Sequence, residues 1–156
     1  RIPPAAVIIR PATPADYPAL ADLWFDSWTS IGISNETDWP RETVRERLYE
    51  EVVDRWCLFA AQERDELVGM LALALAEQRV DQLFVAPSYQ GKGVGLALLE
   101  FAKQELPDRI VLVTQEENVR ARRFYEREGF CLHRSEYDEL HRRMNCHYVW
   151  TISADP

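Results

Sequence analysis

The pattern of apolar and polar residues along the chain predicts seven strands. Short apolar or alternating runs, each bounded by turn-forming residues, have the length and the period of strands. They cover residues 6–12, 56–62, 66–75, 79–86, 109–115, 131–137 and 146–152. The run at 109–115 is rich in β-branched residues, which is typical of a buried strand.

Apolar residues spaced three or four positions apart predict four helices between these strands. Thr13 and Asp16 have the spacing of a capping box at the start of the first helix. A loop rich in turn-forming residues follows that helix at 29–40. The apolar faces of the first three helices comprise, in order, Tyr17, Leu20, Trp24 and Trp28; Val44, Leu48 and Val52; and Val94, Ala97, Leu98 and Phe101. The fourth helix covers 118–130, with Gly129 at its end.

The order of these elements is β-α-α-β-β-β-α-β-α-β-β. Such an order predicts a mixed α/β (α+β) fold in which residues 1–156 form a single domain. A chain of 156 residues is long enough to bury a core of its own. No internal repeat or low-complexity linker divides the sequence.

Composition narrows the classes of function. The chain carries 26 acidic residues against 18 lysines and arginines, and this net charge of −8 disfavours nucleic acid and anionic membranes as partners. It favours a cationic partner only faintly, since an acidic surface also serves solubility. Cys57, Cys131 and Cys146 are odd in number and lack a C-x-x-C spacing, so we expect neither a disulfide framework nor a metal site. The sequence shows no signal peptide and no membrane-spanning run, which favours a cytoplasmic setting.

A glycine-rich turn connects the strand at 79–86 to the helix that follows it. Gly91, Gly93 and Gly95 allow successive main-chain amides to turn toward one point, and the helix adds its N-terminal amides and the positive end of its dipole. This arrangement suits a phosphate or a pyrophosphate, and Lys92 can add charge. The spacing matches neither a Walker loop nor G-x-G-x-x-G, and a tight connection without a ligand is the simple alternative.

The segment VDQLFVAPSYQGKGVGLALLEFA resembles the acetyl-CoA-binding motif of the GCN5-related N-acetyltransferases, the GNAT family. Gln90, Gly93 and Gly95 match the family pattern Gln/Arg-x-x-Gly-x-Gly/Ala, and Pro87 follows the strand as in the family. A second family motif is matched by Asn118, Ala121, Phe124, Tyr125, Gly129 and Phe130. The two motifs have the expected separation, and the resemblance covers most of the chain.

The resemblance implies a mixed, mostly antiparallel sheet flanked by about four helices. Its two central parallel strands, the fourth and the fifth, correspond to 79–86 and 109–115 and splay apart to admit acetyl-CoA. The turn implied to hold the pyrophosphate comprises Gln90, Gly91, Lys92, Gly93, Val94, Gly95 and Leu96. The pantetheine arm is implied to pair with the strand edge at Leu83, Phe84 and Val85, near Asn118.

The family transfers the acetyl group by direct attack of an amine on the thioester, and Tyr125 matches the tyrosine that protonates the departing thiolate. A core aromatic is the alternative role for Tyr125. The strand position where some members carry a glutamate base holds Val113 and Thr114 here, so that assignment fails. Asp81 is the better candidate for a base that acts through a water, and Glu77 is the second. Exposed carboxylates, and a reaction with no dedicated base, remain the alternatives.

The resemblance places an acceptor pocket beside the first two helices and the last hairpin. Trp28, Trp39 and Tyr137 are the candidates for its lining, with a core role as the alternative. His133, His141 and His147 are scattered and lack a metal-binding spacing. The predicted function is an N-acetyltransferase that uses acetyl-CoA and an amine acceptor without a metal; homodimers are common in this family. A non-catalytic acyl-CoA sensor is the alternative, and a nucleotide-phosphate binder is a more remote one.

Overall fold

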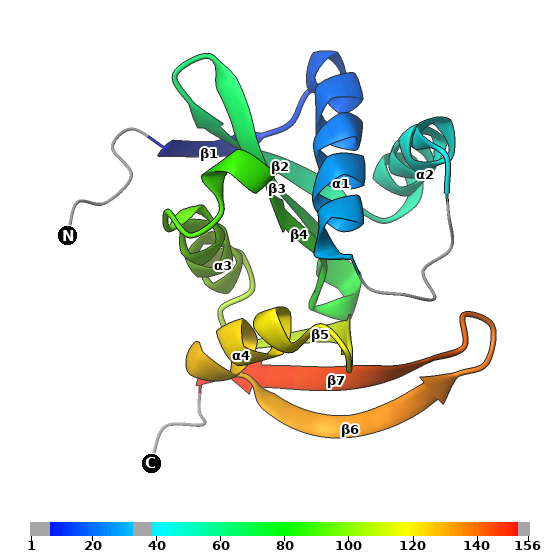
Figure 1. Cartoon of the computed structure of the whole chain (residues 1–156). Coiled ribbons are helices and arrows are strands. Elements are labelled where there is room, and N and C mark those ends of the chain that lie inside the picture. Colours follow the sequence, from blue (N-terminus) through cyan, green and yellow to red (C-terminus); the bar gives the residue numbers. More distant parts are fainter. Residues whose placement is uncertain (1–6, 33–38, 153–156) are drawn as a thin grey trace.

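Seven strands form one mixed sheet in the order β1-β2-β3-β4-β5-β7-β6 (Figure 1). The structure, a computed structural model, describes residues 7–32 and 39–152. The strands are β1 (Val7–Pro11), β2 (Cys57–Glu63), β3 (Glu66–Ala74), β4 (Arg79–Val85), β5 (Arg109–Gln115), β6 (Cys131–Asp138) and β7 (Arg143–Thr151). Neighbours are antiparallel except β4 and β5, which are parallel. The expected mixed, mostly antiparallel sheet is confirmed.

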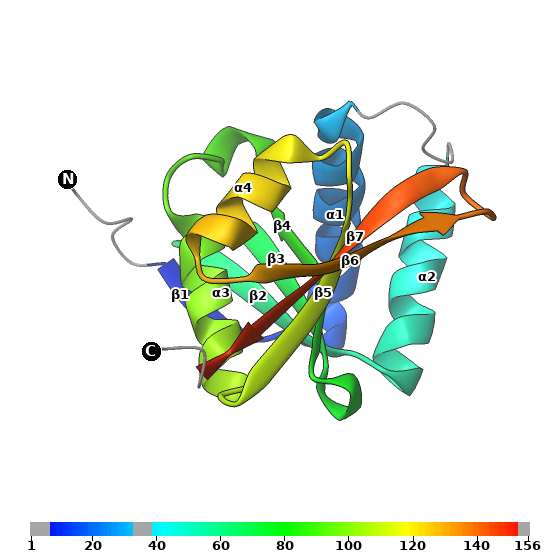
Figure 2. The ribbon, with the colours of Figure 1, turned by 90° about the horizontal axis from the view of Figure 1, so that it is seen from below.

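Two helices cover each face of the sheet (Figures 1 and 2). The helices are α1 (Tyr17–Ile31), α2 (Arg41–Asp54), α3 (Val94–Glu105) and α4 (Val119–Arg127), with 3-10 turns η1 (Pro14–Asp16), η2 (Leu75–Glu77) and η3 (Pro87–Tyr89). The pair α1 and α2 buries Leu20 and Leu48 against one face, and α3 and α4 bury Leu98 and Tyr125 against the other. β3 lies between the two cores, which explains why its residues 68–74 are buried without alternation.

Element boundaries differ from the expectation mainly at polar residues. α1 extends to Ile31, beyond the predicted start of the loop, and ends at Gly32 with a φ of 72°. β7 begins at Arg143, three residues before the predicted start at Cys146, because main-chain pairing with β5 and β6 does not depend on apolar side chains. Ala6 of the first predicted strand and residues 33–38 of the predicted loop lie outside the described residues.

The parallel strands β4 and β5 lie side by side at one end only. Arg79 faces Val111 in this pair, and the Val111 amide donates to the Gln78 carbonyl at 2.8 Å. In residues 7–32 and 39–152, no further register pair joins the two strands. The expected splay of the fourth and fifth strands is therefore confirmed.

A β-bulge in β4 marks the point where the strands part. Val80 and Gln82 face adjacent residues of β3, so Asp81 is an extra residue in the ladder. A bulge bends its strand and increases the local twist. The bend carries the second half of β4 away from β5, toward α1.

Ser27 of α1 holds the far end of β4 in this diverging position. Its side chain is buried, and its hydroxyl donates to the Val85 carbonyl at 2.8 Å. We predict that Ser27→Ala lowers the free energy of unfolding by about 1 kcal/mol, because a buried hydrogen bond is lost. Urea denaturation measures the change. Ser30→Ala is the matched control on the same helix, since Ser30 is exposed and donates to the Ser27 carbonyl; an equal loss in both variants would contradict the prediction.

Candidate active site

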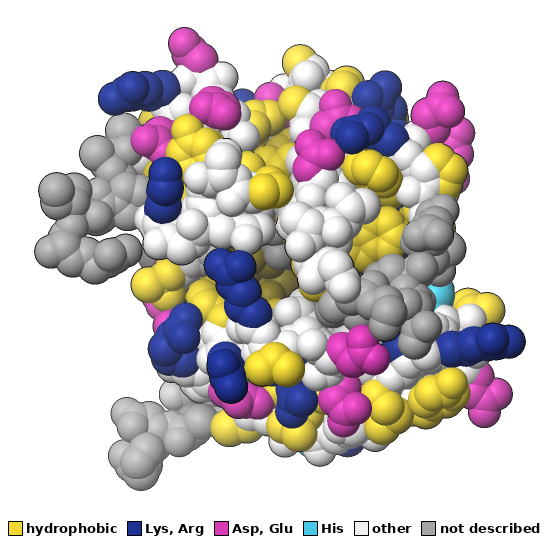
Figure 3. All heavy atoms as spheres, in the orientation of Figure 1, with side chains coloured by type: hydrophobic (Ala, Val, Ile, Leu, Met, Phe, Trp, Pro, Cys, Tyr) yellow, Lys and Arg dark blue, Asp and Glu magenta, His cyan; other side chains and the backbone are white. Residues whose placement is uncertain are grey.

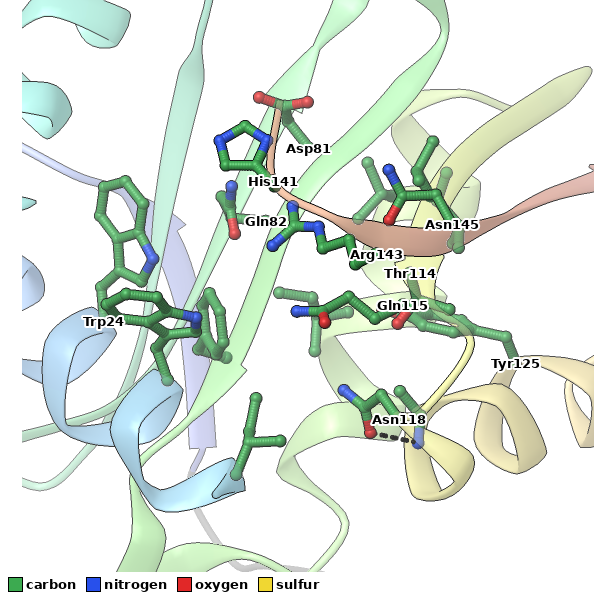
Figure 4. Close-up of a pocket in the computed structure, with 18 of the residues that line it drawn as sticks. Trp24, Asp81, Gln82, Thr114, Gln115, Asn118, Tyr125, His141, Arg143 and Asn145 are labelled. Carbon is green, nitrogen blue, oxygen red and sulfur yellow. Dashed lines mark hydrogen bonds between the residues drawn. The ribbon is translucent and has the colours of Figure 1, made fainter. Parts of the chain in front are cut away.

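A cleft of about 340 Å³ opens where β4 and β5 part (Figure 4). Its walls are residues 80–84 of β4 and 112–115 of β5, with side chains from α1, α2, α4 and the β6–β7 hairpin. Along these residues β4 and β5 no longer pair with each other. The cleft therefore exposes main-chain amides and carbonyls that a closed sheet would satisfy internally. A ligand that lies along the strands can supply those partners.

The glycine-rich turn lies between the end of β4 and α3. Gly91 and Gly93 have φ values of 79° and 89°, in the left-handed region that glycine adopts without strain. Gly93 is the N-cap of α3, and Ala97 makes the first intrahelical bond of the helix, to the Gly93 carbonyl at 3.1 Å. The amides of the first turn therefore precede the hydrogen-bonded part of the helix and point toward its N-terminal end, where the dipole is positive.

Gln90 links the two sides of the splay. Its Nε2 donates to the Val85 carbonyl at 3.3 Å, and its Oε1 accepts from Arg120 of α4 at 3.1 Å. Lys92 lies 5.2 Å from the centre of the Tyr89 ring. Figure 3 shows Lys and Arg side chains gathered over α4, along one edge of a hollow with an apolar floor. The cations around the glycine-rich turn favour an anionic ligand there despite the negative charge of the whole chain.

Asn118 and Tyr125 stand on the side of α4 that faces the cleft (Figure 4). The Asn118 side chain accepts from the Ala121 amide at 3.1 Å, as an N-cap does. The Tyr125 ring is buried beside Phe124 and Phe130, at centroid distances of 5.1 and 5.5 Å. Burial raises the pKa of Tyr125, so its phenol stays protonated at neutral pH. No described residue makes a hydrogen bond to this hydroxyl, which leaves it able to donate to a ligand.

Of the two carboxylates proposed as the base, the structure brings only Asp81 to the cleft. Its Oδ2 already accepts from Trp56 Nε1 at 2.7 Å and from Arg55 at 3.2 Å. Glu77 lies outside the cleft, where the hydrogen bond from Arg55 lowers its pKa. Asp81 thus has one oxygen engaged by two donors, and only Oδ1 is left for a ligand.

The acceptor side of the cleft is aromatic. Trp28 and Trp39 line it together with Trp24, and the Trp28 and Trp39 rings are 6.0 Å apart. The Arg47 guanidinium lies 4.9 Å from the Trp39 ring. Tyr137 is 54% exposed and lies outside the lining, so the structure does not bring this third aromatic candidate to the cleft.

The β6–β7 hairpin contributes residues that the sequence analysis missed. His141, Arg143 and Asn145 line the cleft, and His141 Nδ1 lies 2.8 Å from Asp138 Oδ2. In the sequence, the histidines show only that they lack a metal-binding spacing. The spacing Asp138-x-x-His141 lies between two predicted strands, but it does not reveal the cleft beside which the pair lies. Within residues 7–32 and 39–152, no three His, Cys, Asp or Glu side chains are grouped as a metal site. No helix in the described part of the chain is long and apolar enough to cross a membrane.

Residues 17–130 match the sequence model of the Acetyltransferase (GNAT) family. The chain belongs to the GNAT family. It is 29% identical over 144 residues to "Probable N-acetyltransferase Rv2775" of Mycobacterium tuberculosis, a match that covers 81% of each protein. It is 40% identical over 82 residues to the peptidyl-lysine N-acetyltransferase YjaB of Escherichia coli, where the match spans about half of each chain, 52% of this one and 54% of YjaB.

Solved GNAT structures share the whole fold. A GCN5-related N-acetyltransferase from Rhodopseudomonas palustris superposes with a TM-score of 0.80 at 15% identity, over 97% of this chain and 99% of that one. The PaiA N-acetyltransferase of Thermoplasma acidophilum, in complex with coenzyme A, gives 0.76 at 20% identity, over 94% and 99%. The family identification confirms the resemblance seen in the sequence, and the protein is an acetyltransferase of the GNAT class, a family that uses acetyl-CoA.

The glycine turn of this GNAT protein offers a test of coenzyme A binding. Gly93→Ala places a side chain in the left-handed region, which is unfavourable by about 1–2 kcal/mol and displaces the amides at the start of α3. We predict that the Kd for coenzyme A rises about tenfold or more, equivalent to about 1.4 kcal/mol, by isothermal titration calorimetry. Gly129→Ala, at a φ of 98° beyond α4, is the control with a similar positive φ, and its added Cβ would lie 3.4 Å from Trp150 Cδ1. Equal Kd values for the two variants would refute a role for this turn.

Proposed function

We propose that this protein binds acetyl-CoA in the splay between β4 and β5 and transfers the acetyl group directly to a primary amine. The observation that carries the proposal is the parting of these strands between a glycine-rich helix N-terminus at one end and the Tyr125 hydroxyl on the wall. Anion-binding amides, an exposed strand edge and a protonated donor are the three features that the reaction needs.

In this arrangement, the pyrophosphate lies against the amides of the turn from Gln90 to Leu96. The pantetheine arm runs along β4 past Asn118. Ser27 and Gln90 already donate to the Val85 carbonyl, so the arm pairs with main-chain groups around Leu83 and Phe84. The thioester then reaches the bulge at Asp81, where the β4 ladder is interrupted. A main-chain amide of this stretch is the donor that we propose for the oxyanion.

The chemistry follows from the groups around the thioester. The neutral amine attacks the carbonyl carbon, an N–C bond forms, and the negative charge develops on the carbonyl oxygen. The C–S bond then breaks, and the Tyr125 hydroxyl gives its proton to the departing thiolate. The new amide nitrogen releases its surplus proton to solvent, and the Tyr125 phenolate regains one from solvent. Asp81 Oδ1 is the group that holds the amine in the cleft, since Oδ2 is engaged by Trp56 and Arg55.

The acceptor we propose is a primary amine on an apolar stem. Trp24, Trp28 and Trp39 form an apolar wall for such a stem. The described lining contains Arg47 and Arg143 against the single carboxylate of Asp81, so the negative charge of the whole chain is not repeated there. A lysine side chain of a peptide has this chemistry, and YjaB is named for it. The cytoplasmic setting inferred from the sequence, and the homodimer that the family resemblance allows, stay predictions.

Tyr125→Phe tests the proton donor. The substitution keeps the buried ring and removes only the hydroxyl, so we predict that kcat falls about 10²-fold or more while the Kd for coenzyme A is unchanged. Thiol release from acetyl-CoA with a saturating amine measures kcat. Tyr137→Phe, on the exposed hairpin strand, is the control and keeps full activity. An unchanged kcat in Tyr125→Phe would remove the tyrosine from the mechanism.

A panel of amines tests the acceptor and the alternative of a sensor. It contains an Nα-acetylated lysine peptide, a peptide with a free α-amine, phenethylamine and spermidine, each with acetyl-CoA. We predict that the lysine peptide and phenethylamine give higher kcat/KM than spermidine, which has no bulky apolar body. If coenzyme A binds but no amine accelerates thiol release, the protein is an acyl-CoA sensor rather than an enzyme.

A further inference from the structure

The proposed transfer requires a base that neither Tyr125 nor Asp81 readily supplies. A primary alkylamine has a pKa near 10, so only about one molecule in a thousand is neutral at pH 7. The Tyr125 hydroxyl stays protonated because burial raises its pKa. Asp81 has its Oδ2 bound by Trp56 and Arg55. The described lining of the cleft holds one further side chain with the chemistry of a general base, the imidazole of His141.

The β6–β7 hairpin fixes the His141 ring in a defined orientation. Residues 139–142 form the turn, which Arg142 closes in the left-handed region at a φ of 56°. The Asp138 carboxylate accepts from the His141 amide at 3.2 Å and from the ring Nδ1 at 2.8 Å. Two bonds from one carboxylate therefore hold both the main chain and the ring, as the acidic member of a catalytic dyad does.

This pairing determines which ring nitrogen can take a proton. The hydrogen bond from the His141 ring, and to a smaller extent the one from the His141 main chain, lower the pKa of Asp138, so its carboxylate is charged at neutral pH. A charged carboxylate at Nδ1 requires the proton of the neutral ring on that nitrogen. Nε2 is then the acceptor, and no described residue occupies it. Figure 4 shows His141 reaching into the cleft from the hairpin, on the side of Asp81 and Gln82.

Charges of both signs surround the ring. Asp138 on its own hairpin pairs with the ring, and Asp81 from β4 is the carboxylate that lines the same cleft. Arg143 of β7, whose Nε lies 4.0 Å from Asp138 Oδ2, and Arg47 of α2 are the guanidinium groups on the same cleft. The positive charge that an imidazolium would carry is thus met by the Asp138 carboxylate, which suits a group that receives a proton during the reaction.

We infer that His141 Nε2 is the general base that takes the proton from the acceptor amine, with Asp138 as its positioning residue. The inference rests on the proposed acetyl transfer. The acceptor enters as an ammonium group. One N–H bond breaks, its proton moves to Nε2, and the electron pair left on nitrogen forms the N–C bond to the acetyl carbon. The C–S bond breaks and the thiolate takes the proton of Tyr125. The imidazolium and the new amide nitrogen then each lose a proton to solvent, and the Tyr125 phenolate regains one from solvent.

The pH dependence of kcat/KM tests this role, with acetyl-CoA and the Nα-acetylated lysine peptide between about pH 5.5 and 10. A protonated imidazole cannot act as a base, so we expect the native enzyme to lose activity toward the acidic end of this range. We expect His141→Gln to reduce kcat/KM about 10²–10³-fold at pH 7. The variant instead gains activity up to the pH at which the free amine loses its proton.

Matched variants separate this role from structural effects. Asp138→Asn is expected to lower kcat/KM about tenfold or more, since the ring loses the partner that fixes its tautomer. His133→Gln on β6, which is exposed, keeps the native profile. His147 is the alternative source of an acidic limb, and its pKa is lowered mainly by burial. Because His147 pairs with Glu136 outside the cleft, we expect His147→Gln to keep the native profile as well. Urea denaturation confirms that each variant is folded.

The outcomes distinguish this inference from the proposed function. Suppose that the native protein acetylates the peptide but His141→Gln keeps the native acidic limb of the kcat/KM profile. The inference is then overturned and the transferase function stands. The same holds if Asp81→Asn abolishes this limb while His141→Gln does not. If the native protein acetylates no amine of the panel, the proposed function fails. Nitrogen-15 NMR of the coenzyme A complex then still decides the dyad: the Nδ1–H tautomer of His141 supports it, and the Nε2–H tautomer overturns it.

Discussion

The parting of β4 and β5 is the constraint on which the rest of this structure depends. The two strands share one register pair at Arg79 and then diverge, because the extra residue Asp81 bends β4. Without that divergence, the amides of β4 would be satisfied within the sheet and the cleft would not exist. The fold supports the open edge from outside through Ser27, which bonds the end of β4, and through Gln90, which reaches both β4 and α4. The cleft is therefore held open by defined hydrogen bonds on either side of it.

Much of this arrangement could be predicted from the sequence because its signals are local. The turn at Gly91 and Gly93 needs residues that accept positive φ, and glycine at these positions is visible without a structure. The strand and helix periods are equally local, and they placed the elements in the right order. The family resemblance then supplied the splay, which no local pattern shows. The site residues carried over from the family still await the experiments described above.

Three features could not be predicted, each for a physical reason. The bulge at Asp81 adds one residue to β4 without changing the composition of the strand, so hydropathy alone does not show it. A register shift in β6 between Leu132 and Arg134 moves the side chains that follow to the opposite face of the sheet from the one that strict alternation predicts. Tyr137 lies beyond this shift and is exposed. The Asp138–His141 pair is a contact across a hairpin turn, and its meaning depends on a cleft formed by segments more than a hundred residues apart, such as Trp28 of α1.

The two walls of the cleft come from differently arranged parts of the chain. One wall of the cleft comes from one continuous stretch, from β4 through α4, whereas the opposite wall comes from α1, α2 and the β6–β7 hairpin. Under the proposed function, substitutions in α1, α2 and this hairpin would alter which amine is accepted and leave the thioester side unchanged. A scaffold of this layout would then diversify its acceptors by drift in segments remote from the proposed cofactor site.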